Sequence, residues 1–395
     1  MIASPALQDT SFRKSMPERV VSVGWMLLAL GVALVIGAYA DDARRAAFDN
    51  TILFLFLASL AAGSVFLVAL EYISGAVWSV PMRRVTEFIS GLAPLLPLVG
   101  FPLLFQLHGL FSWSHQEVLS GDSLLQGKSP YLNVPFFIVR FGVVSALWIL
   151  FFYLFTRNSM KQDETADQKL TTWNIRLAAI FLPVFAVTLT VTIIDWGMSL
   201  EPHWFSTILG VYYFAGTVLA AVAAVTVAVV YLLEAGYLPK LRGDHLYSLG
   251  ALMFAFVNFW AYIAFSQFLL IWYSNMPEET VWFMKRWQNG WEIVSVLLIV
   301  VHFAVPYFVL LPQEAKKNLK TLKFMAIWLL FAHLLDIYWL VMPTYAETVS
   351  IGWMELGIPL VVVGLSIVVL SWNMSRHSLV PLKDPKLERA LQFRL

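Results

Sequence analysis

Residues 51–70, TILFLFLASLAAGSVFLVAL, decide the class of the fold, because they form 20 consecutive residues without a charged side chain. A helix that crosses the hydrocarbon core of a membrane needs about 20 mainly apolar residues. The whole chain has the same character: 59% of its 395 residues are hydrophobic, 13% are charged, and the mean hydropathy is +0.74. Soluble domains are about 25% charged. The sequence therefore predicts an all-α polytopic membrane protein embedded in a lipid bilayer.

Long apolar runs, separated by proline, glycine and clusters of charge, predict ten membrane spans. These are residues 20–40, 51–78, 87–107, 136–156, 174–198, 206–233, 246–273, 291–311, 322–342 and 351–373. An even number of spans puts both termini on one side of the membrane. Of the 26 Lys and Arg residues, 20 lie in or beside the tails and loops of that side, and 5 lie in the opposite loops. Because cytoplasmic loops carry the excess of Lys and Arg, we expect both termini to be cytoplasmic.

Two segments four spans apart share a pattern: Asp195 and Asp336 each lie seven residues before a proline, and the outer loop that follows lacks Lys and Arg. A duplicated four-helix bundle would produce such a repeat. We expect spans 2–5 and 6–9 to form two bundles, with spans 1 and 10 peripheral. The expected domains are cytoplasmic tails at 1–19 and 374–395, and a membrane domain at 20–373 that holds a first bundle (50–198) and a second (206–342).

Ionisable side chains within a span cost about 2.5–3.5 kcal/mol at the membrane centre and mark functional sites by default. Glu71, Asp195, His333 and Asp336 are therefore candidates for a proton path. His333 and Asp336 are three residues apart on one helix, so they share a face. Asp195 lacks such a partner, and we expect it to be protonated unless Arg140 or another cation faces it. The alternative to a proton path is a structural role, in which each acid makes a hydrogen bond to a neighbouring helix.

The outer connections carry further polar and aromatic residues. His108, Arg140, Glu201 and His203 are predicted to rim the outer surface. The long segments 108–135 and 274–290 suit contact with a partner protein, and an aromatic belt at the membrane interface is the alternative. The candidates for partner contact are Trp113, Glu278, Trp282, Arg286 and Trp287.

Local signals predict two details of the backbone. Pro94, Pro97 and Pro102 predict that the third span is kinked. Asn275, with Glu278 three residues later, predicts the capped start of a short interfacial helix.

The composition excludes several classes of function. The chain has no cysteine, which excludes disulfides and thiolate-bound iron–sulfur clusters. A formal charge of +1 argues against nucleic-acid binding. His302 and His333 lie nearest the middle of the membrane, so one bis-histidine haem is the most that the histidines could hold. We instead expect His302 to be a hydrogen-bonded packing residue, and we expect this chain to have no catalytic residue, metal or cofactor of its own.

The segment 195–207, DWGMSLEPHWFST, followed by Gly210-Val211-Tyr212, resembles the NrfD-like (polysulfide-reductase membrane-subunit) family. The likeness is to the membrane subunits of alternative complex III, a quinol:cytochrome c oxidoreductase. The segment 273–280, YSNMPEET, with Arg286, Gly290 and Trp291, is similar to a second signature of these subunits. The family has ten spans in two four-helix bundles.

This resemblance implies a place in the bacterial inner (cytoplasmic) membrane and a set of partners. They are a sister NrfD-like subunit, a periplasmic iron–sulfur protein and haem c subunits, which hold the iron–sulfur clusters and haem. Quinol or menaquinol is the implied ligand, and the outer-rim residues named above are then candidates for the quinone side.

Three functions stay open at this point. The first is a subunit that borders or binds quinol and offers a path for proton translocation. The second is a cofactor-free structural anchor for the iron–sulfur and haem subunits. The third is an autonomous secondary transporter built around a midplane site. A transporter of this kind predicts inverted repeats and interrupted helices. It is disfavoured because repeats of four spans have parallel topology, and because no span of this sequence has a midway Gly/Pro break that is paired in the other half.

Overall fold

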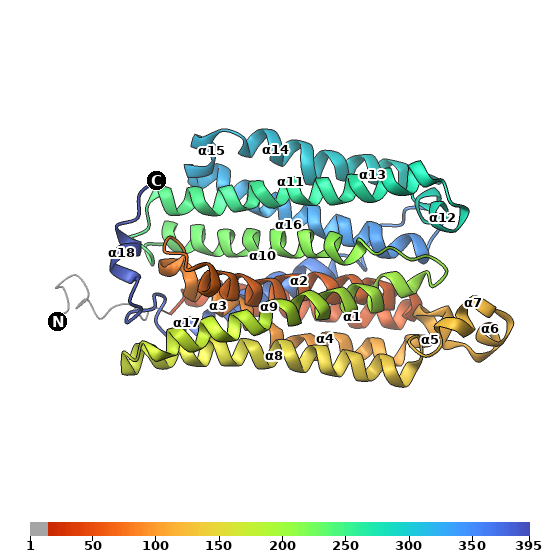
Figure 1. Ribbon diagram of the computed structural model, residues 1–395, viewed down its shortest axis with the longest axis horizontal. Helices are drawn as coiled ribbons and strands as arrows, with labels where there is room; N and C mark the ends of the chain where they lie inside the picture. The colour runs from red at the N-terminus through yellow and green to blue at the C-terminus, as the bar shows by residue number, and fades with distance from the viewer. Residues whose placement is uncertain (1–14) are drawn as a thin grey trace.

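The computed structural model describes residues 15–395, and over this range it consists of helices without strands. Ten helical segments within this range are long and apolar enough to cross a membrane. Eight are formed by single α-helices: α1 (Glu18–Asp41), α2 (Ala43–Ser74), α8 (Val134–Thr165), α9 (Lys169–Trp196), α10 (Leu209–Glu234), α11 (Gly243–Ser274), α16 (Leu319–Val341) and α17 (Gly357–Arg376). They run side by side along the long axis of the molecule (Figure 1). The protein is therefore an all-α polytopic membrane protein, as the sequence predicts.

The two remaining spans are interrupted. The third (Val80–Phe105) consists of η2 (Val80–Met82), α3 (Arg83–Ser90), η3 (Ala93–Leu95), α4 (Leu96–Gly100) and η4 (Phe101–Phe105). A proline stands in the first turn of four of these pieces, where its missing N–H is tolerated. The eighth consists of α13 (Trp291–Leu298), the π-helical turn η7 (Ile299–Ala304) and α14 (Val305–Leu310).

Short helices occupy the two ends of the molecule (Figure 1). They are α5 (Leu107–Leu110), η5 (Ser112–Ser114), α6 (Gln116–Gly121), α7 (Ser123–Lys128), η6 (Met198–Leu200), α12 (Pro277–Lys285), α15 (Gln313–Lys317), η8 (Met342–Thr344) and α18 (Leu387–Leu391). The predicted cap at Asn275 is wrong. Asn275 instead ends α11 in the left-handed conformation (φ 47°), and the N-cap of α12 is Met276, without a side-chain bond.

Both predicted boundaries of the second span also shift. The second span begins at Ala43 rather than at residue 51, because the Asp42 side chain accepts hydrogen bonds from the backbone N–H groups of Arg44 and Arg45. It ends at Ser74 rather than at residue 78, because Gly75 adopts a left-handed conformation (φ 67°) that terminates the helix.

The helices pack as two groups that meet along α2 and α10. The first group is α2, the third span, α8 and α9, and the second is α10, α11, the eighth span and α16. The apolar stretch of α2 is 94% buried, which makes it the central helix. At the contact between the groups, a Cβ on Gly63 would lie 2.8 Å from the Ala221 Cβ, so a glycine is needed there for the close approach.

Helices α1 and α17 form a separate pair beside the first group. Their backbones come so close that a Cβ on Gly364 would lie 2.5 Å from the Leu28 nitrogen, and one on Gly31 would lie 2.7 Å from the Val361 nitrogen. Only 11% of the apolar stretch of α1 is buried, so most of this helix faces the surroundings of the subunit.

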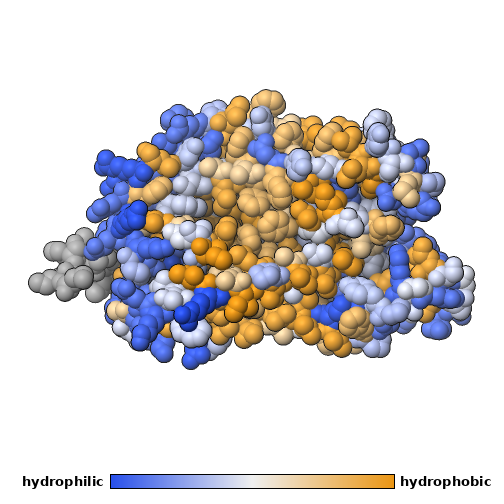
Figure 2. Space-filling model, viewed as in Figure 1, coloured by the Kyte–Doolittle hydropathy of each residue, from blue (hydrophilic) through white to orange (hydrophobic). Residues whose placement is uncertain are grey.

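The surface has the polarity of a membrane protein. Figure 2 shows a broad hydrophobic band across the middle of the molecule and hydrophilic side chains at both ends. The helix α18 lies at one end, and α12 and α5–α7 lie at the other (Figure 1). That the α18 end is cytoplasmic stays a prediction from the distribution of Lys and Arg.

Candidate functional site

The second group of helices surrounds a cavity of about 480 Å³ in the half nearer α12. This volume lies in the range of about 300–1,000 Å³ that is typical of small-molecule sites. The walls are formed mainly by apolar and aromatic side chains of α10, α11, α12, the eighth span and α16. The lining residues are Tyr212, Asn258, Trp260, Ala261, Tyr262, Ala264, Phe265, Gln267, Phe268, Phe283, Trp287, Ser295, Leu298, Ile299, Phe303 and Trp339.

The cavity opens onto the apolar surface of the protein. Tyr262, Phe265 and Ile299 line it, and their side chains are 65%, 62% and 55% exposed. All three belong to membrane spans, so this opening faces the hydrocarbon of the bilayer. A lipophilic molecule dissolved in the membrane could therefore enter sideways between α11 and the eighth span.

Polar groups gather at the inner wall. The Tyr212 hydroxyl donates a hydrogen bond to Asp336 Oδ1, and the Trp260 indole N–H donates to Asp336 Oδ2 at 3.1 Å. Gln267 is buried, and its Nε2 has no hydrogen-bond partner within residues 15–395. Gln267 also lines a neighbouring hollow of about 160 Å³. Its amide is therefore a buried donor beside the cavity that is unpaired within the described residues.

Behind this wall lies a buried cluster of His302, His333 and Asp336. The sequence predicts that His333 and Asp336 share a face, and His333 Nδ1 lies 4.0 Å from Asp336 Oδ2. His333 Nε2 is joined to the Ser59 hydroxyl at 3.0 Å, which links α16 to α2. The His302 ring stacks on the indole of Trp260 with 3.8 Å between centroids. The predicted hydrogen bond of His302 is wrong, since neither ring nitrogen has a partner in the described chain.

Asp195 does not stand alone, because Arg140 faces it. Arg140 Nε and Nη2 donate to the two oxygens of Asp195 at 2.8 and 2.9 Å, and the Tyr131 hydroxyl donates to Oδ1 at 3.0 Å. Arg140 Nη1 also donates to the Tyr131 carbonyl at 2.8 Å. The preceding span thus supplies the cation that faces Asp195, and the Arg140 guanidinium binds the Asp195 carboxylate in a bidentate manner.

Glu71 lies in a different ion cluster, at the α18 end of the first group. Arg83 Nη1 bonds Glu71 at 3.1 Å, while Arg83 Nη2 bonds Asp384 of the C-terminal segment at 2.5 Å. Glu87 lies 3.5 Å from Arg83 Nε. Glu71 and Asp195 are therefore each paired with an arginine at opposite ends of the first group, and neither lines the cavity.

The predicted outer-rim residues lie outside the cavity. His108 Nδ1 is hydrogen-bonded to Ser114, and His203 Nε2 lies 2.5 Å from Asp122, a contact that lowers the pKa of Asp122. Glu201 binds Lys285 at 2.8 Å and lies 3.6 Å from Arg286.

The five residues predicted for partner contact differ in burial, and the side chains of three of them lie inside the subunit. Trp113 donates to the Ser199 carbonyl at 3.2 Å, and Trp282 stacks on Trp204 at 4.5 Å. Arg286 is fully buried and lies over the ring of Trp282. Its burial lowers its pKa to about 10. Glu278 and Trp287 are exposed and stay candidates, and Trp287 also lines the cavity.

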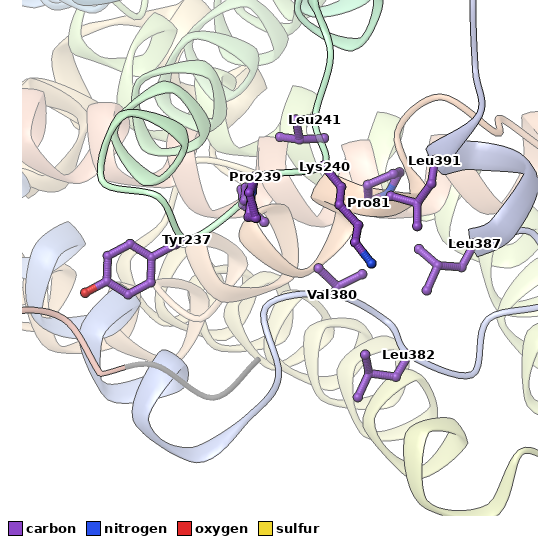
Figure 3. Close-up of a pocket in the computed structure, with 10 residues that line it drawn as sticks. Pro81, Tyr237, Pro239, Lys240, Leu241, Val380, Leu382, Leu387 and Leu391 are labelled. Carbon is purple, nitrogen blue, oxygen red and sulfur yellow. The ribbon is translucent and has the colours of Figure 1, made fainter. Parts of the chain in front are cut away.

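A second, apolar hollow lies at the α18 end, where the C-terminal segment meets the loop between α10 and α11. Figure 3 shows Val380, Leu387 and Leu391 on one side, and Pro239 and Leu241 on the other. Its volume of about 30 Å³ is that of roughly one water molecule. This hollow is a packing junction and too small for a ligand.

Comparison of the chain with protein-family models and with curated proteins finds no match. The resemblance to NrfD-like subunits stays a prediction from the two motifs.

Proposed function

We propose that the chain is an NrfD-like membrane subunit of a quinol:cytochrome c oxidoreductase of the alternative complex III type, and that it binds quinol or menaquinol in the cavity of the second group. The subunit that we propose is ActF, the smaller of the two NrfD-like subunits, also called quinone-binding subunit 2. The partners would be the sister subunit, the periplasmic iron–sulfur protein and the haem c subunits. The chain would lie in the bacterial inner membrane with cytoplasmic termini.

The observation that carries this proposal is the cavity that opens sideways to hydrocarbon. A quinol consists of a flat ring with two polar oxygens and a long apolar tail. The aromatic walls suit the ring, and the exposed mouth at Tyr262 and Phe265 gives the tail a way out into the bilayer. Gln267 lines the cavity, and its buried amide, which is unpaired within the described residues, would donate to one ring oxygen. Electrons from the quinol would pass to the iron–sulfur and haem groups of the partners.

A second candidate function is the cofactor-free anchor, and one observation favours it. Two of the four predicted proton-path residues, Glu71 and Asp195, are held by arginines at hydrogen-bond distance. Buried carboxylates bound in this way hold helices together. In this case the acids stabilise the packing of the helices, and the subunit positions its partners without binding quinol.

Cavity filling tests the proposal. Ala264→Trp places an indole inside the cavity, whereas Ala179→Trp on α9 places one on the exposed apolar surface. We expect a photoreactive quinone analogue to label residues 261–268 in the wild-type complex, and Ala264→Trp to reduce this labelling at least about tenfold, the equivalent of 1.4 kcal/mol. Ala179→Trp should leave it unchanged.

Labelling that is equal in all three proteins, or that falls outside the second group, would contradict quinol binding in the cavity. A complex that retains every partner but shows no labelling of this chain would favour the anchor. Mass spectrometry of the labelled peptides and of the assembled complex gives both results.

A further inference from the structure

The structure brings together three possible metal ligands that are far apart in the sequence. His302 from η7, and His333 and Asp336 from α16, each offer one ligand atom, and these atoms lie within 4.8 Å of one another. All three side chains are at most 1% exposed. We propose that they bind one divalent transition-metal ion, and that Zn²⁺ fits the site. This goes beyond the proposed function and does not depend on quinol.

Unpaired nitrogen atoms are the first argument. Both ring nitrogens of His302, and Nδ1 of His333, are buried without a hydrogen-bond partner in residues 15–395. An unpaired buried polar group is destabilising, because it has lost its hydrogen bonds to water without gaining others. Another fully buried histidine shows what this chain does elsewhere: His245 Nδ1 accepts from the backbone N–H of Arg242, and its Nε2 lies 2.9 Å from the Ala390 carbonyl oxygen. A metal ion between His302 and His333 would bind the lone pairs that are left over.

The backbone around His302 is the second argument. η7 is a π-helical turn, a rare element that occurs frequently at functional sites. Pro306 follows four residues after His302, so it cannot supply the α-helical hydrogen bond to the His302 carbonyl. The altered turn places the His302 ring against Trp260, with its centroid 6.4 Å from that of His333.

The donor set and its supports fit zinc. Two imidazoles and one carboxylate suit Zn²⁺, whereas Ca²⁺ and Mg²⁺ favour oxygen ligands. Zn–N bonds of about 2.0–2.1 Å put neighbouring tetrahedral ligands about 3.3 Å apart, so side-chain rotations of the order of 1 Å would close the site. Ser59 holds His333 Nε2, and this leaves Nδ1 towards Asp336. Tyr212 and Trp260 orient the Asp336 carboxylate, as outer partners of metal ligands do.

A bound ion would have a structural consequence. It would join the eighth span to α16 at the point where the π-helical turn weakens the regular hydrogen bonding of that span. It would also occupy the lone pair of His333 Nδ1, so that the ring would hold the metal and would not serve as the proton carrier that the sequence suggests.

Metal analysis of the purified full-length chain tests the proposal. After equilibration with Zn²⁺ and removal of free ion, we expect about one zinc per wild-type chain by mass spectrometry. His302→Gln and Asp336→Asn should each lower this at least about tenfold. His203→Gln, at an exposed histidine on the α12 side, and His245→Gln, at the other fully buried histidine, are the matched controls and should retain the ion.

Loading with Co²⁺ keeps the test decisive if the variants fail to fold. Wild-type protein should then show the visible absorption of tetrahedral Co²⁺ with nitrogen and oxygen ligands. Wild-type chain that binds neither Zn²⁺ nor Co²⁺ above background, or a folded His302→Gln variant that retains stoichiometric zinc, would overturn the proposal. Neither result bears on quinone labelling of the cavity, so the two proposals can fail separately.

Discussion

The pair of Arg140 and Asp195 gives the sharpest prediction of stability. Both side chains are buried, at 8% and 3% exposure, and they share two hydrogen bonds of 2.8 and 2.9 Å. Removal of one partner leaves the other charge without compensation in a low-dielectric region, which costs about 3–5 kcal/mol. We therefore expect Asp195→Leu and Arg140→Met each to lower the free energy of unfolding by about that amount.

The double variant should behave differently. Replacement of a buried ion pair by apolar side chains of similar volume is often neutral or stabilising. Arg140→Met combined with Asp195→Leu should therefore recover most of the loss, which gives a coupling energy of at least about 3 kcal/mol. Arg157→Met is the matched control, because Arg157 lies on the same helix with an exposed side chain, and it should change stability by less than about 0.5 kcal/mol.

Steric trapping in bicelles measures these free energies of unfolding at equilibrium. Single variants that each cost less than about 1 kcal/mol, with a double variant equal to their sum, would refute the reasoning. That outcome would mean that water or lipid headgroups reach the pair and replace its hydrogen bonds.

Three further variants test other contacts. Gly364→Leu should destabilise the pair of α1 and α17 by at least about 1–3 kcal/mol, because its Cβ would lie 2.5 Å from the Leu28 nitrogen. Gly142→Leu on α8 is the control, because a Cβ there would meet no atom of the described residues within 4 Å, and thermal unfolding in detergent compares the two variants. Gly216→Ala should lower the affinity for Zn²⁺ at least about tenfold, because the new methyl would lie 2.7 Å from His333 Cε1 and displace the ring. A chelator competition measures this affinity, and an unchanged value would argue against His333 as a ligand. Arg286→Met should lower the free energy of unfolding by about 1.5–3 kcal/mol, because it removes the hydrogen bonds to the carbonyls of Trp339 and Leu340. An unchanged free energy of unfolding would show that water replaces these hydrogen bonds.

The membrane spans could be predicted because hydropathy acts locally along the chain. Each span is long enough to be recognised without knowledge of its neighbours, and proline marks the breaks of the third span. The start of the second span moved because a short-range hydrogen bond decided it. The carboxylate of Asp42 starts α2 eight residues before the expected position, a signal present in the sequence as an acidic residue before a helical run.

Side-chain direction was the part that the sequence could not supply. Trp113 in η5 and Trp282 in α12 lie in the connections between spans, where indoles commonly meet lipid headgroups. Both point inward, because a neighbouring carbonyl or indole satisfies them within the subunit. The cavity is likewise invisible in the sequence, since its walls come from five segments between residues 212 and 339. His302 required knowledge of the π-helical turn that directs it towards His333.

The two aspartates of the repeated pattern show how the two halves of the chain differ. Each lies in the last span of its bundle and meets a side chain from the span before it: Asp195 meets Arg140, and Asp336 meets His302. In the first bundle the partner is a cation, and the aspartate is fully compensated by hydrogen bonds. In the second bundle, and among residues 15–395, the aspartate receives only neutral donors, from Tyr212 and Trp260, and histidine nitrogens beside it have no partner. The cavity lies against Tyr212 and Trp260, the two donors to this second aspartate. The ligand-sized cavity is therefore found in the bundle whose aspartate is bound by neutral donors, and not in the bundle whose aspartate is paired with an arginine.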